Sequence, residues 1–148
     1  MATVGPLNPV IPFELYMGQY GEMLEAVRRM NGEYGIARLL VTGPNLGVRF
    51  DGFPSRDVYR KIGEGIKRLQ NDVADIGMQI GWWCAPSIKC GLNAPYQHIV
   101  GVGGSESPHG LCPLDEGMAA DLASKVALVA EITRPFMIQF EDDFELSN

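Results

Sequence analysis

Acidic side chains gather near the end of the sequence, directly after an apolar segment. Residues 136–140 are mainly apolar, and Glu141, Asp142 and Asp143 follow them. In parallel α/β proteins ligands bind beyond the carboxyl ends of the strands, so carboxylates that follow a buried strand are candidates for chemistry. Because side chains alternate along a strand, Glu141 and Asp143 should share one face with Gln139. We expect Glu141 to be a general acid or base, with Asp142 and Asp143 as supporting or sugar-binding acids.

Two adjacent tryptophans and two histidines are candidates for binding a substrate. Trp82 and Trp83 lie near the end of an earlier apolar segment, and a flat indole there could stack on a sugar ring. The alternative is ordinary packing, with one indole against the helices and the other inside the barrel. His98 and His109 belong to a long polar segment, residues 85–114, which suits hydrogen bonding to a substrate or a mobile surface loop.

A metal site is the competing use for these residues. Residues 141–143 together with His98 or His109 offer the oxygen and imidazole ligands that divalent cations prefer. Their spacing is not diagnostic. A zinc set could add Cys90 and Cys112, but only His109 and Cys112 have ligand-like spacing. We therefore expect no metal and no other cofactor, and keep a metal-dependent enzyme as an alternative.

Helical and strand-like segments alternate along the chain. Apolar residues recur at steps of three and four in three segments, and Ser55 and Asp115 are suitable N-caps. A short joint at Gly35, Gly77 or Pro135 follows each of these segments, and an apolar strand follows each joint. The expected helices span 20–34, 55–76 and 115–130, and the expected strands span 11–17, 36–42, 78–84 and 136–140.

This alternation predicts an α/β fold with a parallel sheet whose strand order follows the sequence. Strand alternation turns Arg38, Gln79, Trp83 and Gln139 to the face away from the helices. The strand-to-helix connections are long and the helix-to-strand joints short, as at the active-site rim of a (β/α) barrel. We expect a half-barrel of about four parallel strands and three helices.

Chain length suggests that such a barrel is incomplete. A complete barrel has eight strands and roughly 250 residues, whereas this chain has 148 residues. We expect residues 1–148 to be the N-terminal part of a single (β/α)8-barrel catalytic domain, truncated after strand four. A self-contained half-barrel or a small open sheet is the alternative. Unpaired edge strands of such a sheet favour self-association.

Composition excludes some partners and compartments. The net charge of -6 opposes binding to nucleic acid, which needs a cationic surface. No apolar segment approaches the roughly 20 residues that cross a bilayer, and no secretory leader is evident. The three cysteines are odd in number, which does not suit a disulfide framework. These features predict a cytoplasmic protein that binds neither membrane nor nucleic acid.

A family resemblance covers most of residues 35–148. Residues 112–115, the helix after them, and the strand and acidic motif at 135–146 resemble uncharacterised bacterial glycoside-hydrolase-like TIM-barrel proteins, and the Gly81–Cys84 strand end fits them too. In many retaining glycosidases of this fold the acid/base is a Glu at the end of strand four and the nucleophile a Glu at the end of strand seven. Glu141 matches the first by position, and the second has no counterpart here.

The resemblance implies the N-terminal half of a glycoside hydrolase that acts on a carbohydrate by carboxylate acid/base catalysis, inactive as this fragment alone. Two alternatives stay open. One is a metal-dependent isomerase, aldolase or hydrolase on the same barrel. The other is a non-catalytic carbohydrate-binding or assembly module that completes its sheet by forming a homodimer.

Overall fold

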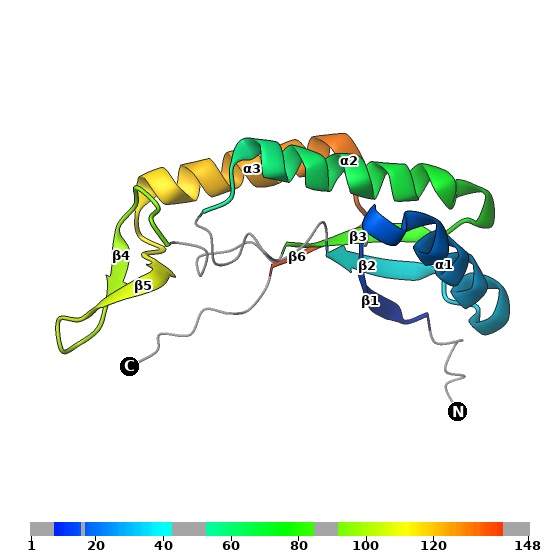
Figure 1. Ribbon diagram of the computed structural model, residues 1–148, viewed down its shortest axis with the longest axis horizontal. Helices are drawn as coiled ribbons and strands as arrows, with labels where there is room; N and C mark the ends of the chain where they lie inside the picture. Colours follow the sequence, from blue (N-terminus) through cyan, green and yellow to red (C-terminus); the bar gives the residue numbers. More distant parts are fainter. Residues whose placement is uncertain (1–7, 16, 43–52, 85–91, 141–148) are drawn as a thin grey trace, which may run out of the picture.

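A four-stranded parallel sheet with three helices on one side forms the body of the molecule (Figure 1). The computed structural model describes residues 8–15, 17–42, 53–84 and 92–140. The strands pair in the order β1-β2-β3-β6, which follows the sequence as predicted, and in this part of the chain the sheet is open, with β1 and β6 at its edges. These strands are β1 (Val10–Glu14), β2 (Arg38–Thr42), β3 (Gln79–Cys84) and β6 (Ile138–Phe140).

Two of the three described helices, those capped by Ser55 and Asp115, begin where the capping residues predict. The Ser55 hydroxyl accepts a hydrogen bond from the Val58 N–H, and the Asp115 carboxylate accepts one from the Met118 N–H at 2.9 Å. Gly35 ends the first helix in the left-handed conformation that glycine adopts without steric cost. The helices are α1 (Tyr20–Tyr34), α2 (Arg56–Asp72) and α3 (Glu116–Thr133), with short 3-10 turns η1 (Met17–Gln19) and η3 (Ala74–Ile76).

The predicted helix over 55–76 is in fact two elements. α2 ends at Asp72, and the remaining residues tighten into η3 before Gly77, which has a φ of 66°. Since the left-handed residue turns the chain back toward the sheet, the last turn closes as 3-10 rather than α. None of the described helices is long and apolar enough to cross a membrane.

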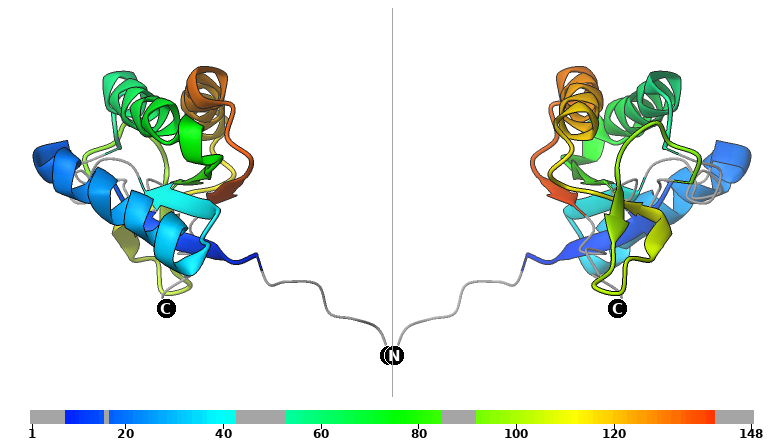
Figure 2. Two further views of the ribbon diagram at one scale, coloured as in Figure 1. Left: turned by 90° about the vertical axis from the view of Figure 1, so that its right-hand side faces the viewer. Right: turned by 90° about the vertical axis from the view of Figure 1, so that its left-hand side faces the viewer.

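The two faces of the sheet have different partners. The side chains of Leu39, Val41, Ile80 and Trp82 belong to one buried cluster with apolar residues of α1, α2 and α3, and Figure 2 shows the helices gathered on this side. Alternation turns the intervening residues to the opposite face. We refer to it as the open face.

The open face carries the polar residues that the sequence predicts for it. Arg38 pairs with Gln79 across β2 and β3, and the Arg38 Nε donates to the Gln79 Oε1 at 2.9 Å. Trp83 pairs with Gln139 across β3 and β6. Gln79 and Trp83 are four residues apart on β3 and so share a face, and laterally paired residues of a parallel sheet share a face as well. Gln79 and Gln139 therefore point to the same side, which confirms the predicted orientation.

The long segment before α3 contains an antiparallel hairpin. Its strands are β4 (His98–Val100) and β5 (Glu106–Leu111), with a tight turn in which Gly104 has a φ of 81°. The hairpin lies beyond the carboxyl ends of β2 and β3, at the end of the molecule where α2 and α3 begin (Figure 1). The sequence pattern predicts no strands here, because Pro108 and Gly110 interrupt the alternation.

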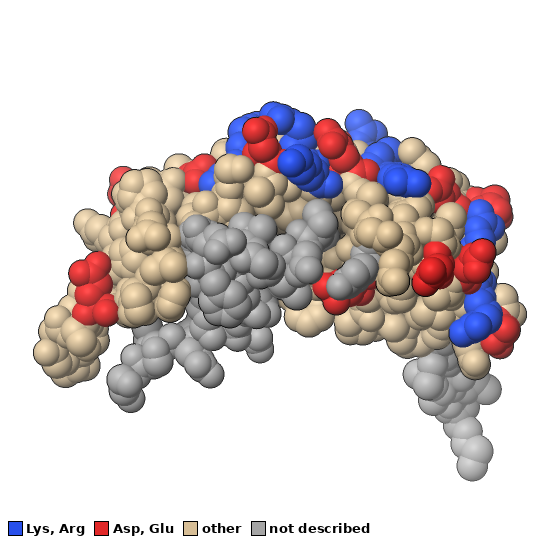
Figure 3. Space-filling model, in the orientation of Figure 1, with Lys and Arg blue, Asp and Glu red and all other residues tan. Residues whose placement is uncertain are grey.

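Charged side chains of α2 lie on the outer surface. Arg60 pairs with Asp57, and Arg68 lies 3.8 Å from Asp72. Basic and acidic side chains are interleaved on the visible face of the molecule over this helix (Figure 3). The outer face of α2 is therefore a mixed, solvated surface rather than a purely basic one.

Candidate functional site

The acidic cluster itself lies outside the described residues. The roles predicted for Glu141, Asp142 and Asp143 therefore stay predictions. The strand that precedes them is described, since β6 pairs in parallel with β3 through Ile138, Gln139 and Phe140. The described part of the candidate site lies at the carboxyl ends of the four strands.

Four side chains form a single row across those carboxyl ends. Glu14 pairs with Thr42, Thr42 pairs with Trp83, and Trp83 pairs with Gln139. All four side chains project from the open face, away from the helices. We call Glu14, Thr42, Trp83 and Gln139 the carboxyl-edge row. It combines one carboxylate, one hydroxyl, one amide and one indole, all suited to hydrogen bonding.

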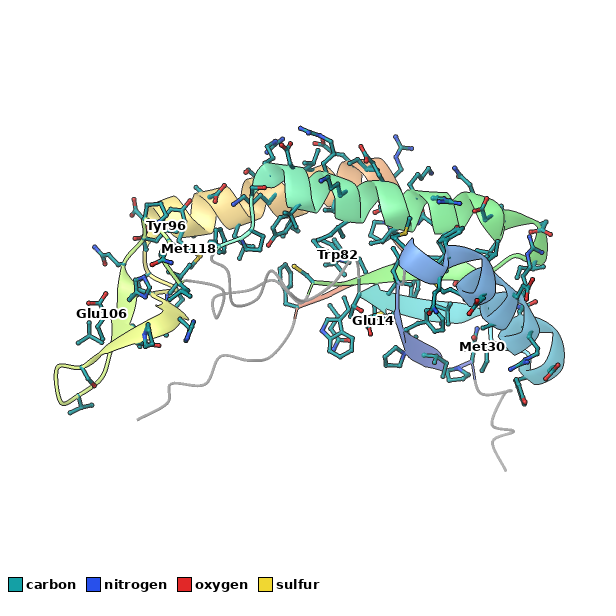
Figure 4. The ribbon with its side chains drawn as sticks, in the orientation of Figure 1. Glu14, Met30, Trp82, Tyr96, Glu106 and Met118 are labelled. Atoms are coloured by element: carbon teal, nitrogen blue, oxygen red, sulfur yellow. The ribbon has the colours of Figure 1, made fainter. Side chains whose placement is uncertain are left out.

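The sequence pattern does not identify Glu14 as a site residue. The expected first strand runs on to Met17, whereas β1 ends at Glu14, so that the carboxylate lies on the strand's last residue. Pro12 obscures the alternation that would otherwise mark Glu14 as an open-face residue, and proline is tolerated here because β1 is an edge strand. The Glu14 side chain is exposed, and in Figure 4 it lies near the end of the sheet.

The two tryptophans have separate environments. Trp82 is 0% exposed and packs edge-to-face on Tyr59, with ring centroids 6.2 Å apart. Its indole offers no face to solvent, so it belongs to the helix-side core. Trp83 is half-buried on the open face, and the buried Nε1 of each tryptophan has no hydrogen-bond acceptor among the described residues. Trp83 is therefore the tryptophan that is positioned to contact a ligand.

An apolar layer lies next to the carboxyl-edge row on the open face, two residues earlier on β1, β2 and β3. Pro12, Leu40 and Gly81 are paired laterally on the open face, and Leu40 is only 3% exposed. A Cβ on Gly81 would lie 3.0 Å from atoms of Phe136 and Met137, so these residues would have to shift to admit a larger side chain. The polar carboxyl-edge row therefore borders a closely packed apolar layer on the same face of the sheet.

The predicted histidines lie on the hairpin rather than on the sheet. The His98 Nδ1 is 2.8 Å from the Ser107 carbonyl oxygen, a contact within the hairpin. His109 lies on β5 with an exposed side chain. In the part of the chain that the structure describes, no group of three or more His, Cys, Asp or Glu side chains is arranged to hold a metal ion.

Comparison with protein-family models, with curated proteins and with solved structures finds no match to the chain. The resemblance of residues 112–146 to glycoside-hydrolase-like barrels therefore stays a prediction.

Proposed function

We propose that the chain supplies part of the active site of a carbohydrate-acting (β/α) barrel, with glycoside hydrolysis as its reaction. The carboxyl-edge row is the observation that carries the proposal. Parallel α/β proteins bind ligands beyond the carboxyl ends of their strands, and the row lies at that position. A cytoplasmic location, expected from the odd number of cysteines, is part of the proposal.

Each member of the row has a role that suits a sugar. The Trp83 indole, half-buried at the carboxyl end of β3, would stack on the apolar face of a pyranose ring. Glu14 would accept hydrogen bonds from hydroxyl groups. Thr42 and Gln139 can both donate and accept, which matches the dual character of a sugar hydroxyl.

Glu14 is too far from β6 to share a scissile bond with a carboxylate there. It lies three strands from Gln139, or roughly 14 Å at the usual strand spacing. The two carboxylates of a glycosidase are about 5–9.5 Å apart. We therefore assign Glu14 to substrate binding.

The proton donor in this proposal is Glu141. It stands two residues after Gln139 in the sequence, the spacing of one strand face. Asp142 and Asp143 are the supporting acids. The second catalytic carboxylate would come from further strands that close the barrel beside β1 and β6.

Two alternatives are separable from this proposal. A metal-dependent barrel enzyme would use the acids at 141–143 as ligands, and added divalent cation would then stabilise the fold and support turnover. A carbohydrate-binding or assembly module would bind sugar without turnover and would pair its edge strands in a dimer.

The test is hydrolysis by the full-length barrel enzyme that the proposal implies, on two kinds of glycoside, one with a good aryl leaving group and one with an unactivated sugar leaving group. Glu141→Gln should lower kcat/KM by about 100-fold or more on the unactivated glycoside and much less on the aryl glycoside, because only the first needs a proton. Glu145→Gln is the matched control, since it removes a nearby carboxylate to which the proposal gives no role. Equal losses on both substrates would refute the proton-donor role, and rescue by a divalent cation would favour the metal alternative.

A further inference from the structure

A second polar site lies at the hairpin end of the molecule, apart from the carboxyl-edge row. A cavity of about 230 Å³ is lined there by Phe53, Asn93, Tyr96, Asp121 and Lys125, among others. These residues come from α3, the segment before α2 and the segment before β4. None of these elements contributes to the row, and Figure 4 shows Tyr96 well separated from Glu14.

Lys125 is the unusual residue of this cavity. It is only 5% exposed, although lysine is rarely buried without a partner. Its Nζ donates to the Asp121 Oδ2 at 2.5 Å and lies 4.3 Å from the centroid of the Phe53 ring. The ring centroid of Tyr59 lies 5.9 Å from the same atom. The ammonium is therefore held by one carboxylate and two aromatic faces, an environment that stabilises a cation away from water.

Tyr96, together with Asp121 and Lys125, forms the polar wall of the cavity. Its hydroxyl donates to the same Asp121 Oδ2 at 2.8 Å, and its ring packs edge-to-face with Phe53 at 5.6 Å. Burial and the hydrogen bond to Asp121 raise the pKa of Tyr96 to about 12. Tyr96 is thus a neutral phenol at physiological pH, and Asp121 stays paired with two donors.

The charges of this wall cancel. Lys125 and Asp121 neutralise one another at contact distance. A charged ligand would have to compete with this ion pair, and the free-energy cost of doing so increases with burial. A neutral ligand meets no such cost. Both bonds to Asp121 end on Oδ2, and among the described residues Oδ1 accepts none, which leaves an acceptor for a hydroxyl group.

Asn93 adds a second kind of polar group. It is exposed and has a φ of 58°, a left-handed conformation that asparagine tolerates better than most residues. Its amide offers both a donor and an acceptor to the cavity. Phe53 and Tyr96 supply apolar ring surface beside these polar groups.

We propose that this cavity binds a neutral, polyhydroxylated ligand about the size of one pyranose ring. The volume is below the roughly 300–1,000 Å³ of pockets for drug-sized ligands, so a single ring is the appropriate size. Mixed donors and acceptors, aromatic faces and internally cancelled charge are the properties that recognise a sugar hydroxyl pattern. The site goes beyond the proposed function, because it involves no residue of the carboxyl-edge row and stands if that proposal fails.

The test is an NMR titration of the full chain with methyl glucoside, methyl galactoside and methyl mannoside, with glucuronate and glucosamine as charged probes. We expect at least one neutral glycoside to shift the signals of Phe53 and Tyr96, and the charged probes to bind about tenfold more weakly or not at all. Independent shifts at the Trp83 indole would report the other site, so the two proposals are read separately.

Two variants and one control accompany the titration. Asn93→Gly keeps the left-handed backbone and removes the amide, and the loss of one or two hydrogen bonds should weaken binding by about 5- to 50-fold with an unchanged Tm. Lys125→Met keeps the apolar stem and should abolish binding. Asn71→Ala removes an exposed amide from the far end of α2 and should leave binding unchanged. Saturating neutral glycoside without shifts at Phe53 and Tyr96, wild-type affinity in Asn93→Gly, or tighter binding of a charged probe would overturn the proposal.

Discussion

Trp83 and Gln139 are paired directly across β3 and β6, so that both side chains project from the face of the sheet that the helices leave uncovered. Trp82, one residue earlier, projects to the other face and is enclosed by the helices. The two adjacent tryptophans therefore differ in their roles. One holds the fold together, and the other is available to a ligand.

This division predicts unequal stability losses. Trp82→Ala should lower the free energy of unfolding by about 3–5 kcal/mol, because it removes a wholly buried indole from the core. Trp83→Ala should cost less than half as much, since Trp83 is half-buried. Urea denaturation followed by circular dichroism measures both. Equal losses would show that the open face is as tightly packed as the helix side.

The alternation of the strands could be predicted from the sequence because it is a local property. The apolar positions of β2, β3 and β6 assign their helix side, and the polar positions between them then face the other way. Ser55, Asp115 and Gly35 mark helix ends through their own chemistry, so these boundaries were also predictable.

Gly81→Ala should destabilise the fold. The new Cβ would lie 3.0 Å from atoms of Phe136 and Met137, including the Met137 backbone oxygen, so the β3–β6 pairing must shift. We expect a loss of about 1–3 kcal/mol. Gly32→Ala is the matched control, because its Cβ would meet nothing within 4 Å and α1 should gain about 0.5–1 kcal/mol. A neutral effect of Gly81→Ala would contradict the close packing of this layer.

Asp115 should make stability dependent on acid pH. Hydrogen bonds from the Gln97 and Met118 N–H groups hold the pKa of its carboxyl below the ordinary value. A lowered folded-state pKa means that the stabilisation is complete above the unfolded-state value, about 3.9, and is lost as the pH falls through the folded-state pKa.

Asp115→Asn is the variant that isolates this effect. Asparagine retains the capping acceptor and cannot titrate in this range. The wild type should be the more stable protein at pH 6, and the difference should shrink as the pH is lowered through 4 toward 2. A difference independent of pH would show that charge at Asp115 contributes nothing.

The lateral register between strands and the burial of Lys125 could not be predicted from the sequence. Lateral register joins Glu14 to Thr42 and Trp83, and no local pattern gives the register between strands from different parts of the chain. Lys125 and Asp121 have the four-residue spacing of an ordinary surface pair, and only the packing of the Phe53 ring against Lys125 shows that the lysine is buried.

The unpaired edge strands of the sheet favour association between copies of the chain. β1 and β6 each have one unpaired side in the described part of the chain, and Phe140 on β6 is 47% exposed. We expect the 148-residue chain to form dimers or larger species at micromolar concentration in light scattering coupled to size exclusion. A monodisperse monomer with a cooperative unfolding transition would show that the sheet needs no partner.

The carboxyl-edge row is tested most directly by the indole N–H signals of the two tryptophans in a ¹H–¹⁵N NMR titration with neutral oligosaccharides. Trp82→Phe and Trp83→Phe assign the two signals. We predict that a bound sugar shifts the Trp83 signal in a saturable manner, leaves the Trp82 signal in place, and loses about tenfold or more in affinity in Glu14→Gln. A Trp83 signal that stays unchanged at saturating sugar, across glucans, galactans, mannans and xylans, would contradict the assignment of this row as a carbohydrate site.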